Sequence, residues 1–352
     1  MSSSVRVTRT SSSRLSETAL ETAQFGTIFS DHMLIANFEN GQWREAEIIP
    51  YGPLPLPPAP IALHHGQTVF EGLKAHRTLD GRIAMFRPSE NYARLNRSAT
   101  RLVMPEVPAS LFLNGIAELV RLDREWIPER EGGALYIRPV YFAIDESLQV
   151  RPSSQYRLVV LTCPVGPYFA GRINLVVEER YVRAFPGGTG DIKPAGNYAG
   201  SLLASCEAQE RGYQNVLWLD GIERRFIEEC GMMNVFFVID GAVVTPPLSG
   251  TILPGVTRDS VLTLLRDMGK TIEERPVAID EVFELYAAGR LTEAAGVGTA
   301  ATIAPIGRIG YRNREIELAP VGSDSLLERV RMKLEAIRTG RETDRHSWLM
   351  YL

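Results

Sequence analysis

A glycine-rich stretch, PGGTGDIKPAGNY at residues 186–198, contains a single lysine, Lys193. So much glycine is needed where a backbone turns tightly or approaches a ligand closely. Lys193 lies between Ile192 and Pro194, and a lysine shielded from water has a lowered pKa and can form a Schiff base. A solvated loop lysine fits the composition as well, so the stretch alone leaves both interpretations open. A nucleotide-binding phosphate loop is excluded, because the pattern GxxxxGK[ST] is absent.

Two further segments have the character of anion-binding turns. LPGVTR at residues 253–258 leads into a predicted helix, and the free N–H groups at a helix N-terminus bind phosphate well. GVGTA at residues 296–300 is a second turn of small residues that carries a hydroxyl group. Either segment alone also fits an ordinary turn. Together with Lys193, they give one predicted domain two candidate phosphate sites and an amine that can form an imine.

Two adjacent acids, Glu228 and Glu229, lie in the predicted strand RFIEECG at residues 225–231. Neighbouring residues of a strand point to opposite faces, so we expect only one of the two to be buried. Glu229 shares its face with Ile227, which favours Glu229 as the buried acid. A buried carboxylate needs a partner, and a protonated pyridine nitrogen would serve; an exposed acidic pair is the alternative.

The elements that must position these residues are mixed helices and strands, which we interpret as an α+β fold of two domains that divide near residue 170. Asp220-Gly221 and Asp240-Gly241 are typical of hairpin turns. Strands are predicted over residues 134–143, 156–163, 173–180 and 181–185. Helices are predicted from Ser89 towards Leu102, after Thr257, and over about residues 109–125, 202–212, 279–289 and 324–339.

Length and composition limit the possible classes of protein. A chain of 352 residues exceeds the usual size of a single core, and a formal net charge of −4 gives no reason to expect nucleic acid or membrane as a partner. Three cysteines without a CxxC pair exclude a disulfide framework and a zinc site, so we expect the reducing cytoplasm and no metal. The Ser- and Arg-rich start predicts a disordered tail, although transit peptides have a similar composition.

The sequence resembles the branched-chain aminotransferases of the fold-type-IV pyridoxal-phosphate enzymes over about residues 26–350. Several separate motifs in the same order carry this resemblance, which makes it specific. They are FSDHM (29–33), VFEGLKA (69–75), MFRP (85–88), LYIRPV (135–140), PVGPYF (164–169), YVRAFPGGTGDIKPAGNYAGSLL (181–203), VLWLDG (216–221), IEECGMMNVFFV (227–238), LPGVTRDS (253–260) and GTAA (298–301).

The resemblance implies pyridoxal 5'-phosphate as the cofactor and roles for individual residues. Lys193 matches the Schiff-base lysine, Tyr198 the tyrosine that hydrogen-bonds the phenolic oxygen of the cofactor, and Glu229 the acid at its pyridine nitrogen. Arg87 matches the phosphate-binding arginine, a role that sequence patterns alone do not suggest. The residues that match the phosphate-binding turns are Val256, Thr257 and Thr299. The residues that match positions around the substrate are Phe70, Tyr136, Arg138, Tyr168 and Ala300.

One departure from the family pattern concerns the substrate pocket. The family usually has LHY before the FEG motif, whereas this chain has Leu63-His64-His65, so His65 replaces a tyrosine beside the substrate. Small residues at 294–297 replace a bulkier pair that often contains cysteine. Because one methylene or ring changes discrimination by only ~1–3 kcal/mol, these changes affect the substrate range and leave the cofactor residues intact. His65 is interpreted either as a packed neutral ring or as a proton-linked specificity element.

The resemblance also implies an architecture and an activity. The expected parts are a disordered tail (1–25), a small N-terminal α/β domain (26–169), an interdomain segment (170–180) and a larger cofactor-binding domain (181–352), with the cofactor at the domain interface. A homodimer would transfer the amino group of L-leucine, L-isoleucine or L-valine to 2-oxoglutarate, giving branched 2-oxo acids and L-glutamate. The alternatives are a relative acting on D-amino acids or amines, an aminodeoxychorismate lyase, and a cofactor-binding protein without transaminase activity.

Overall fold

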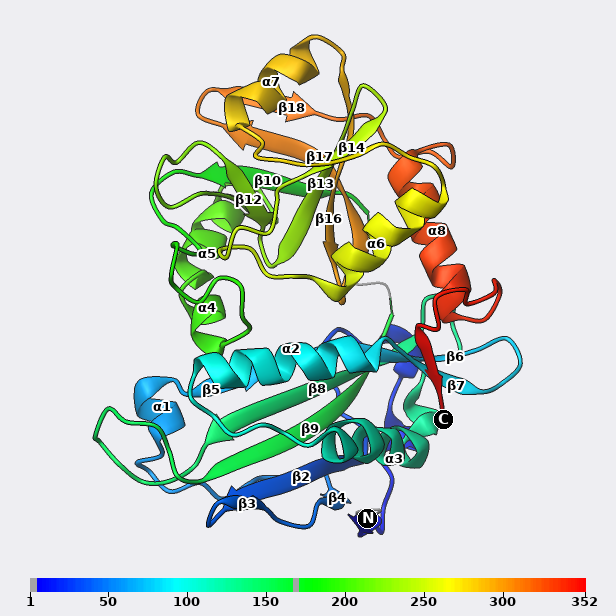
Figure 1. Cartoon of the computed structure of the whole chain (residues 1–352). Helices are drawn as coiled ribbons and strands as arrows, with labels where there is room; N and C mark the ends of the chain where they lie inside the picture. The colour runs from blue at the N-terminus through cyan, green and yellow to red at the C-terminus, as the bar shows by residue number, and fades with distance from the viewer. Residues whose placement is uncertain (1–4, 167–170) are drawn as a thin grey trace. The chain divides into compact units, whose positions relative to one another are not determined.

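The computed structural model describes residues 5–166 and 171–352, which form two compact units. The first unit comprises Met1–Tyr168, Lys193–Gly196 and Ile337–Leu352, and the second comprises Phe169–Ile192 and Asn197–Ala336. The sequence led us to expect all of residues 181–352 in one domain. The difference arises because the C-terminal strand β19 (Leu349–Tyr351) pairs with β7 (Ile83–Phe86) (Figure 1), and because the backbone of Lys193 and Pro194 bonds to that of residues 69 and 70.

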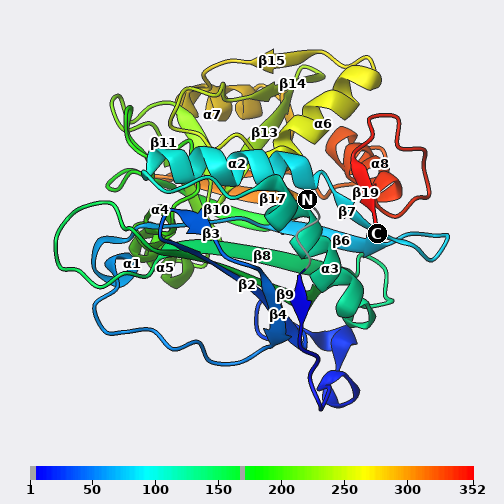
Figure 2. The same ribbon diagram turned by 60° about the horizontal axis from the view of Figure 1, so that its bottom comes forward.

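The first unit is built on a sheet of ten strands among the described residues, and all of its pairs are antiparallel except β1–β4. The strand order is β1-β4-β2-β9-β8-β6-β7-β19, with β3 beside β2 and β5 beside β8. Figure 2 shows β8, β9 and β2 side by side at its centre. The remaining strands are β1 (Arg6–Val7), β2 (His32–Glu39), β3 (Gln42–Trp43), β4 (Glu47–Pro50), β5 (Thr68–Phe70), β6 (Leu73–Arg77), β8 (Ala134–Ala143) and β9 (Tyr156–Val165).

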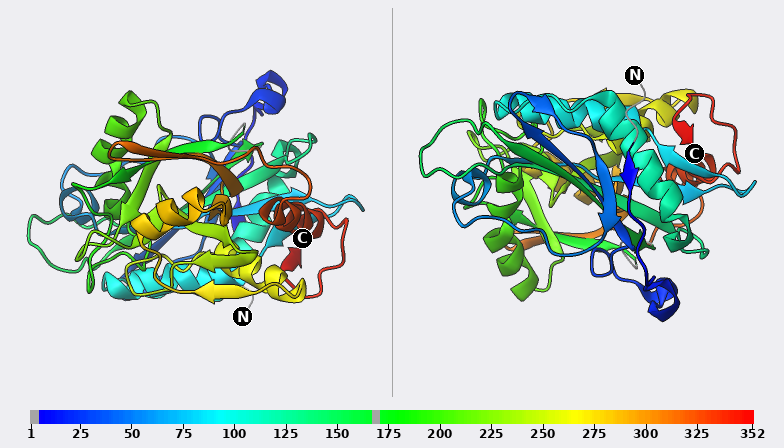
Figure 3. Two further views of the ribbon diagram at one scale, coloured as in Figure 1. Left: turned by 90° about the horizontal axis from the view of Figure 1, so that it is seen from above. Right: turned by 90° about the horizontal axis from the view of Figure 1, so that it is seen from below.

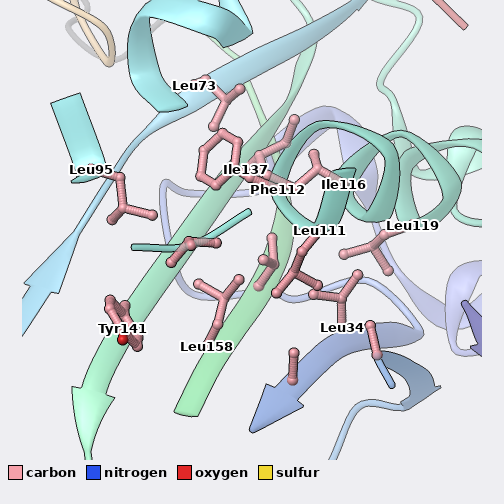
Figure 4. Packing of buried hydrophobic residues seen from close by; sticks show 14 of the residues in the cluster. Leu34, Leu73, Leu95, Leu111, Phe112, Ile116, Leu119, Ile137, Tyr141 and Leu158 are labelled. Atoms are coloured by element: carbon pink, nitrogen blue, oxygen red, sulfur yellow. The ribbon is translucent and has the colours of Figure 1, made fainter. Parts of the chain in front are cut away.

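The core of the first unit lies where helices pack on this sheet. Figure 4 shows Leu111, Phe112 and Ile116 from a helical segment among Leu34 and Leu158 of the sheet, and all five side chains are buried. Burial of such side chains contributes about 1.5–3 kcal/mol each, which fixes the helices on the sheet. The helical segments are η1 (Leu15–Glu17), η2 (Leu20–Thr22), α1 (Ile61–His65), α2 (Pro88–Arg101), the π-helical η3 (Ser110–Asn114), α3 (Gly115–Leu122) and η4 (Arg124–Trp126).

Helix α2 buries polar groups as well as apolar ones. Pro88 begins the helix at a position where its missing N–H costs nothing. The buried face repeats at helical spacing and includes Asn91, Arg94, Leu95 and Ser98. Three of these four side chains are polar or charged, so α2 brings hydrogen-bonding groups into the first unit.

The N-terminal segment differs from the disordered tail that its composition predicted. Arg6–Val7 form β1, which pairs in parallel with β4 (Figure 3, right, dark blue). The Thr10 N–H donates to His32 Nε2 at 2.9 Å, and the Asp31 carboxylate accepts the Arg14 N–H at 3.0 Å. Leu15 and Leu20 pack against the core. Apolar contacts and paired backbone groups therefore order residues 5–25, and the first four residues lie outside the described part of the chain.

The second unit contains a mixed sheet of nine strands in the described chain. Its order is β12-β11-β10-β17-β16-β13-β14-β15, with β18 beside β17. Because β12 pairs with both β11 and β13, six of these strands form a closed circuit. The strands are β10 (Ile173–Glu178), β11 (Asn215–Leu219), β12 (Ile227–Cys230), β13 (Met233–Ile239), β14 (Ala242–Thr245), β15 (Ile272–Glu274), β16 (Leu291–Gly298), β17 (Thr302–Tyr311) and β18 (Arg314–Glu317).

Helices complete the second unit by packing apolar side chains on these strands. Helix α7 (Ile279–Ala287) buries Val282 and Phe283 in the main core, and α5 (Leu202–Glu210) buries Ala204 and Ala208 beside Trp218. Helix α6 is Val256–Asp267, and α4 (Ala195–Ala199) and α8 (Leu326–Arg338) continue across the division between the units. Among the described residues, every helix is too short or too polar to cross a lipid bilayer.

Most predicted elements are confirmed, including α2, β8, β9 and the tight turn at Asp240-Gly241, where both residues have positive φ. The predicted strand at residues 181–185 is wrong. The Tyr181 N–H donates to the Glu178 carboxylate at 2.8 Å, and the Phe185 carbonyl accepts the Gly188 N–H at 2.9 Å in a turn. These local bonds take the place of a strand ladder.

Candidate active site

Lys193 is held in the first unit by two elements that are distant from it in sequence. Its carbonyl accepts the Phe70 N–H of β5 at 3.1 Å, and its N–H donates to Ser98 Oγ of α2 at 3.0 Å. Its Nζ lies 4.8 Å from the centre of the Phe70 ring. Burial, with the Arg94 guanidinium next in effect, lowers the pKa of Lys193 from 10.5 to about 8. A much larger share of the amine is therefore neutral at physiological pH than in a solvated lysine.

A buried ion pair lies next to this lysine. Arg94 Nε and Nη2 donate to the two oxygens of Glu71 at 2.6 and 2.9 Å, and Asn91 Nδ2 donates to Glu71 Oε2 at 2.8 Å. Glu71 is completely buried, and Arg94 is 4% exposed. Although burial opposes ionisation, the Arg94 charge and the Arg94 hydrogen bonds lower the pKa of Glu71 below its usual 4.5, and the Lys193 charge and then the Asn91 hydrogen bond make smaller contributions. Glu71 is therefore an ionised carboxylate at neutral pH.

Tyr136 and Arg138 lie two residues apart on β8, so their side chains share one face of the strand. They place a phenol and a guanidinium group next to each other. Arg138 Nη2 donates to the Tyr136 hydroxyl at 3.2 Å, and the Arg138 guanidinium lies 4.8 Å from the centre of the Phe70 ring. A Cβ on Gly72 would lie 2.0 Å from the Tyr136 hydroxyl, so only glycine leaves room for this tyrosine. The first unit thus brings Lys193, Phe70, Tyr136 and Arg138 together. A guanidinium and a phenol in this arrangement can bind a carboxylate.

The other described candidate residues of the first unit, Arg87 and His65, lie at helix ends. Arg87 precedes α2, eleven residues before Ser98, in a left-handed conformation, with its guanidinium 5.2 Å from the Trp348 ring centre. His65 ends α1, is exposed, and has its Nε2 3.3 Å from the Leu148 carbonyl oxygen. Tyr168 lies outside the described residues.

In the second unit, the candidate acid Glu229 has protein partners. Its carboxylate lies 3.2 Å from Arg183 Nε, accepts the Leu253 N–H at 2.8 Å, and lies 3.4 Å from Asn234 Nδ2. Glu229 is 3% exposed, so the buried charge that strand geometry suggested is present on β12. Because Leu253 begins the LPGVTR segment, this bond also fixes the acid next to the turn that starts α6.

Glu228 is buried as well, which corrects the expectation that only one of the two acids faces inward. It is 6% exposed and accepts a hydrogen bond from Thr251 Oγ1. Burial raises the pKa of Glu228 above its usual value, and the neighbouring Glu229 charge acts in the same direction. The segment after β14 contacts both acids, because Thr251 bonds Glu228 and Leu253 bonds Glu229, and both carboxyl groups are therefore shielded from water.

Of the two predicted turns, LPGVTR leads into a helix as expected, whereas residues 296–298 of the second belong to β16 and its turn begins only at Thr299. Val256 and Thr257 are the first residues of α6, and no side chain caps its first turn, so the N–H groups there lack acceptors within the helix. Thr299 and Ala300 form the turn between β16 and β17 and are partly buried. Tyr198 lies on α4 and is partly buried, and its carbonyl accepts the Ser201 N–H and hydroxyl.

Sequence reasoning missed three residues that organise these groups: Arg94, Arg183 and Asn234. Arg94 had a detectable signal, because its spacing from Leu95 and Ser98 places it on the buried face of α2. Arg183 had none, since its partners come from residues 190, 229 and 251. Asn234 pairs with Glu229 across the β12–β13 turn, which a hairpin register could have indicated.

Comparison with known proteins gives consistent results. The family model of class IV aminotransferases matches residues 68–309. The chain is 46% identical over 329 residues to the probable branched-chain-amino-acid aminotransferase of Staphylococcus aureus (strain N315), covering 92% of both chains. It is 45% identical over 345 residues to the branched-chain-amino-acid aminotransferase of Mycobacterium tuberculosis (strain H37Rv), covering 96% of this chain and 94% of that one.

A solved structure agrees with these relatives. The branched-chain amino acid aminotransferase from Escherichia coli superposes with a TM-score of 0.73 at 27% identity, covering 91% of this chain and 98% of that chain. Likeness of sequence over nearly the whole chain and likeness of fold lead to one conclusion. The protein belongs to the class IV aminotransferases and, within them, to the family of branched-chain-amino-acid aminotransferases.

Proposed function

We propose that this protein transfers the amino group of L-leucine, L-isoleucine or L-valine to 2-oxoglutarate, with pyridoxal 5'-phosphate as cofactor and Lys193 as its Schiff-base lysine. The products are branched 2-oxo acids and L-glutamate. The observation that carries the proposal is the placement of Lys193 between β5 and α2, with its amine beside the Phe70 ring, in a chain of this family; its lowered pKa, about 8, agrees with this role. A neutral amine is the form that attacks a carbonyl carbon.

The donor groups of the chain fit this cofactor. An aldehyde needs a neutral amine, which Lys193 provides. A phosphate needs free N–H groups, which the uncapped first turn of α6 offers at Val256 and Thr257; Arg87 and Thr299 are proposed to assist. A protonated pyridine nitrogen needs a buried carboxylate, which Glu229 provides, and Tyr198 is proposed for the phenolic oxygen. When bound, pyridoxal phosphate supplies the aldehyde and an electron-accepting ring.

We propose that the residues around Lys193 bind and orient the substrate. Arg138 and Tyr136 hold a carboxylate through hydrogen bonds, and Ala300 contributes the small turn beside it. Phe70 offers an apolar ring to a branched side chain, and Tyr168 is assigned to the same wall. The Lys193 amine takes the proton from the α-carbon of the substrate, a step suited to a base with a pKa near the working pH.

The test is transamination from L-leucine to 2-oxoglutarate by Lys193→Ala. We expect turnover to fall by at least about 10³-fold, as for removal of an essential nucleophile. Lys270→Ala is the matched control, because this lysine follows α6 and is partly exposed; it should keep full activity. Near-normal turnover by Lys193→Ala would remove the proposal.

A donor panel separates the proposal from its alternatives. L-leucine, D-alanine and a simple primary amine are offered in turn, and the visible absorption of the bound cofactor is followed together with glutamate formation. Preference for D-alanine or the amine would favour a different class IV activity, and no spectral response would favour a binding protein. His65→Tyr is run beside the wild type, and identical donor profiles would dismiss His65 as a specificity element.

We also propose a homodimer in the cytoplasm. Leu148, whose carbonyl lies 3.3 Å from His65 Nε2, and Val150, two residues later, are 71% and 87% exposed, and exposed apolar side chains of this kind favour a protein interface. The three cysteines are unpaired, as a reducing compartment requires. Light scattering tests the dimer and should give a mass of about twice that of the chain, which is 39.1 kDa. If the exposed apolar residues form the interface, Val150→Asp should shift the measured mass toward that of the monomer.

A further inference from the structure

The Glu71–Arg94 pair is connected to Lys193 through the two elements that hold the lysine backbone. Phe70 bonds the Lys193 carbonyl, and Glu71 is the next residue. Ser98 accepts the Lys193 N–H and itself donates to the Arg94 carbonyl at 2.9 Å. The ion pair and the Lys193 backbone are thus held by the same two segments, the end of β5 and helix α2.

We propose that the buried Glu71–Arg94 pair is a positioning element that sets the charge of Lys193, with Arg94 favouring the neutral amine and Glu71 favouring the ammonium ion. The inference rests on the proposed role of Lys193 and adds two residues to it. Glu71 and Arg94 act through the lysine and are assigned no contact with the substrate.

The charges around Lys193 are unbalanced in a region that burial shields from water. Two cations, Lys193 and Arg94, share one carboxylate, Glu71, so the group that can lose its proton is stabilised in its neutral form. Arginine does not lose its proton in proteins, which leaves Lys193 to do so. On β8, Tyr136 favours the charged amine and Arg138 the neutral one, both with smaller effects than the ion pair.

The two halves of the pair therefore predict shifts of opposite sign. Glu71→Gln removes the anion, leaves Arg94 in place, and should lower the titration midpoint of Lys193 by ~1 pH unit or more. Arg94→Gln removes the cation and should raise the midpoint by a similar amount. Arg94→Lys keeps a positive charge beside Glu71 and should restore a midpoint near that of the wild type.

The readout is the rate at which acetic anhydride modifies Lys193 in the full-length, cofactor-free chain at pH 6–11, measured by peptide mass spectrometry. It does not depend on turnover. If the Lys193 midpoint shifts in opposite directions in the two variants but the wild-type protein has no transaminase activity, the inference holds and the proposed function is wrong. Shifts in the same direction, or none, in folded variants would overturn the inference and leave the proposed function intact.

Controls separate this effect from loss of packing. Asp123→Asn breaks the equally buried His32–Asp123 pair of the same unit, whose atoms are 2.6 Å apart, and should leave the Lys193 midpoint unchanged. If the single variants fail to fold, Glu71→Gln with Arg94→Met removes both charges. Arg94 affects Lys193 more strongly than Glu71 does, so the double variant should have a raised midpoint, and an unchanged or lowered one would overturn the inference.

Discussion

Each unit contains a cluster of buried ionisable groups, and the two clusters have opposite proportions of acid and base. In the first unit, the cations Lys193 and Arg94 share one carboxylate, Glu71. In the second, the carboxylates Glu228 and Glu229 share one cation, Arg183. The pKa of Lys193 is lowered in the first case, and the pKa of Glu228 is raised in the second. The comparison teaches that burial shifts the pKa of the group in excess toward its neutral form, and that this group is an amine in one unit and a carboxyl in the other.

The largest expected effect comes from removing the arginine of the buried ion pair in either unit. Arg94→Met leaves Glu71 without its paired arginine, and Arg183→Met does the same to Glu229. Each should lower the free energy of unfolding by about 3–5 kcal/mol, because an uncompensated buried charge is costly. Chemical denaturation measures the change.

Arg290→Met is the control for these variants, since it breaks the exposed Arg290–Asp240 pair of the second unit. Its effect should stay below about 1 kcal/mol. If Arg183→Met lowers the free energy of unfolding no more than this control does, Arg183 does not compensate a buried charge. That result would contradict the assignment of Arg183 as the cation shared by Glu228 and Glu229.

A smaller effect is expected at two glycines that make room for positioning side chains. A Cβ on Gly72 would lie 2.0 Å from the Tyr136 hydroxyl, and one on Gly255 would lie 2.2 Å from Asn234 Oδ1. Gly72→Ala and Gly255→Ala should each cost about 1–3 kcal/mol of stability. Gly72→Ala should also raise the KM for 2-oxoglutarate, whereas Gly255→Ala should weaken cofactor binding.

Gly52→Ala is the control for both glycines, because nothing lies within 4 Å of its added Cβ. Thermal unfolding measures the loss of stability in the three variants, and steady-state kinetics measures the KM for 2-oxoglutarate and the dependence of the rate on cofactor concentration. Equal kinetic defects in both active-site variants would mean that the two glycines do not serve different groups.

The smallest effect is a difference in how stability depends on pH. The pKa of Glu71 is lowered on folding, so its stabilising contribution is present at neutral pH and lost as the pH falls through the folded-state pKa. The pKa of Glu228 is raised, so the folded state binds the extra proton, and its contribution is lost as the pH rises above about 4.5. We therefore measure the free energy of unfolding between pH 3 and 8. Glu71→Gln should remove a contribution that increases with pH, and Glu228→Gln should remove one that decreases with pH. Slopes of equal sign would refute the opposite charge balance.

Much of the fold could be predicted from local patterns. Pro88 and the spacing of buried residues define α2, and the apolar run at residues 134–143 defines β8. Lys193, Glu229 and the turn at Val256 could also be identified as candidates, because glycine content, strand alternation and helix starts are properties of short segments. Residues 181–185 and the N-terminal segment were mispredicted, since their structure depends on Glu178, Asp31 and β4, which compete with the local preference.

The sequence by itself determined the family, the order of the elements and the lysine with the chemistry of an imine former. Only the tertiary structure decided the charge of that lysine and the partners of the buried acids. Arg94 lies 99 residues before Lys193, and Arg183 lies 46 residues before Glu229. Desolvation and Coulomb energy depend on distance in space and on exclusion of water, and neither quantity exists until β5, α2, β12 and the 251–255 turn have packed.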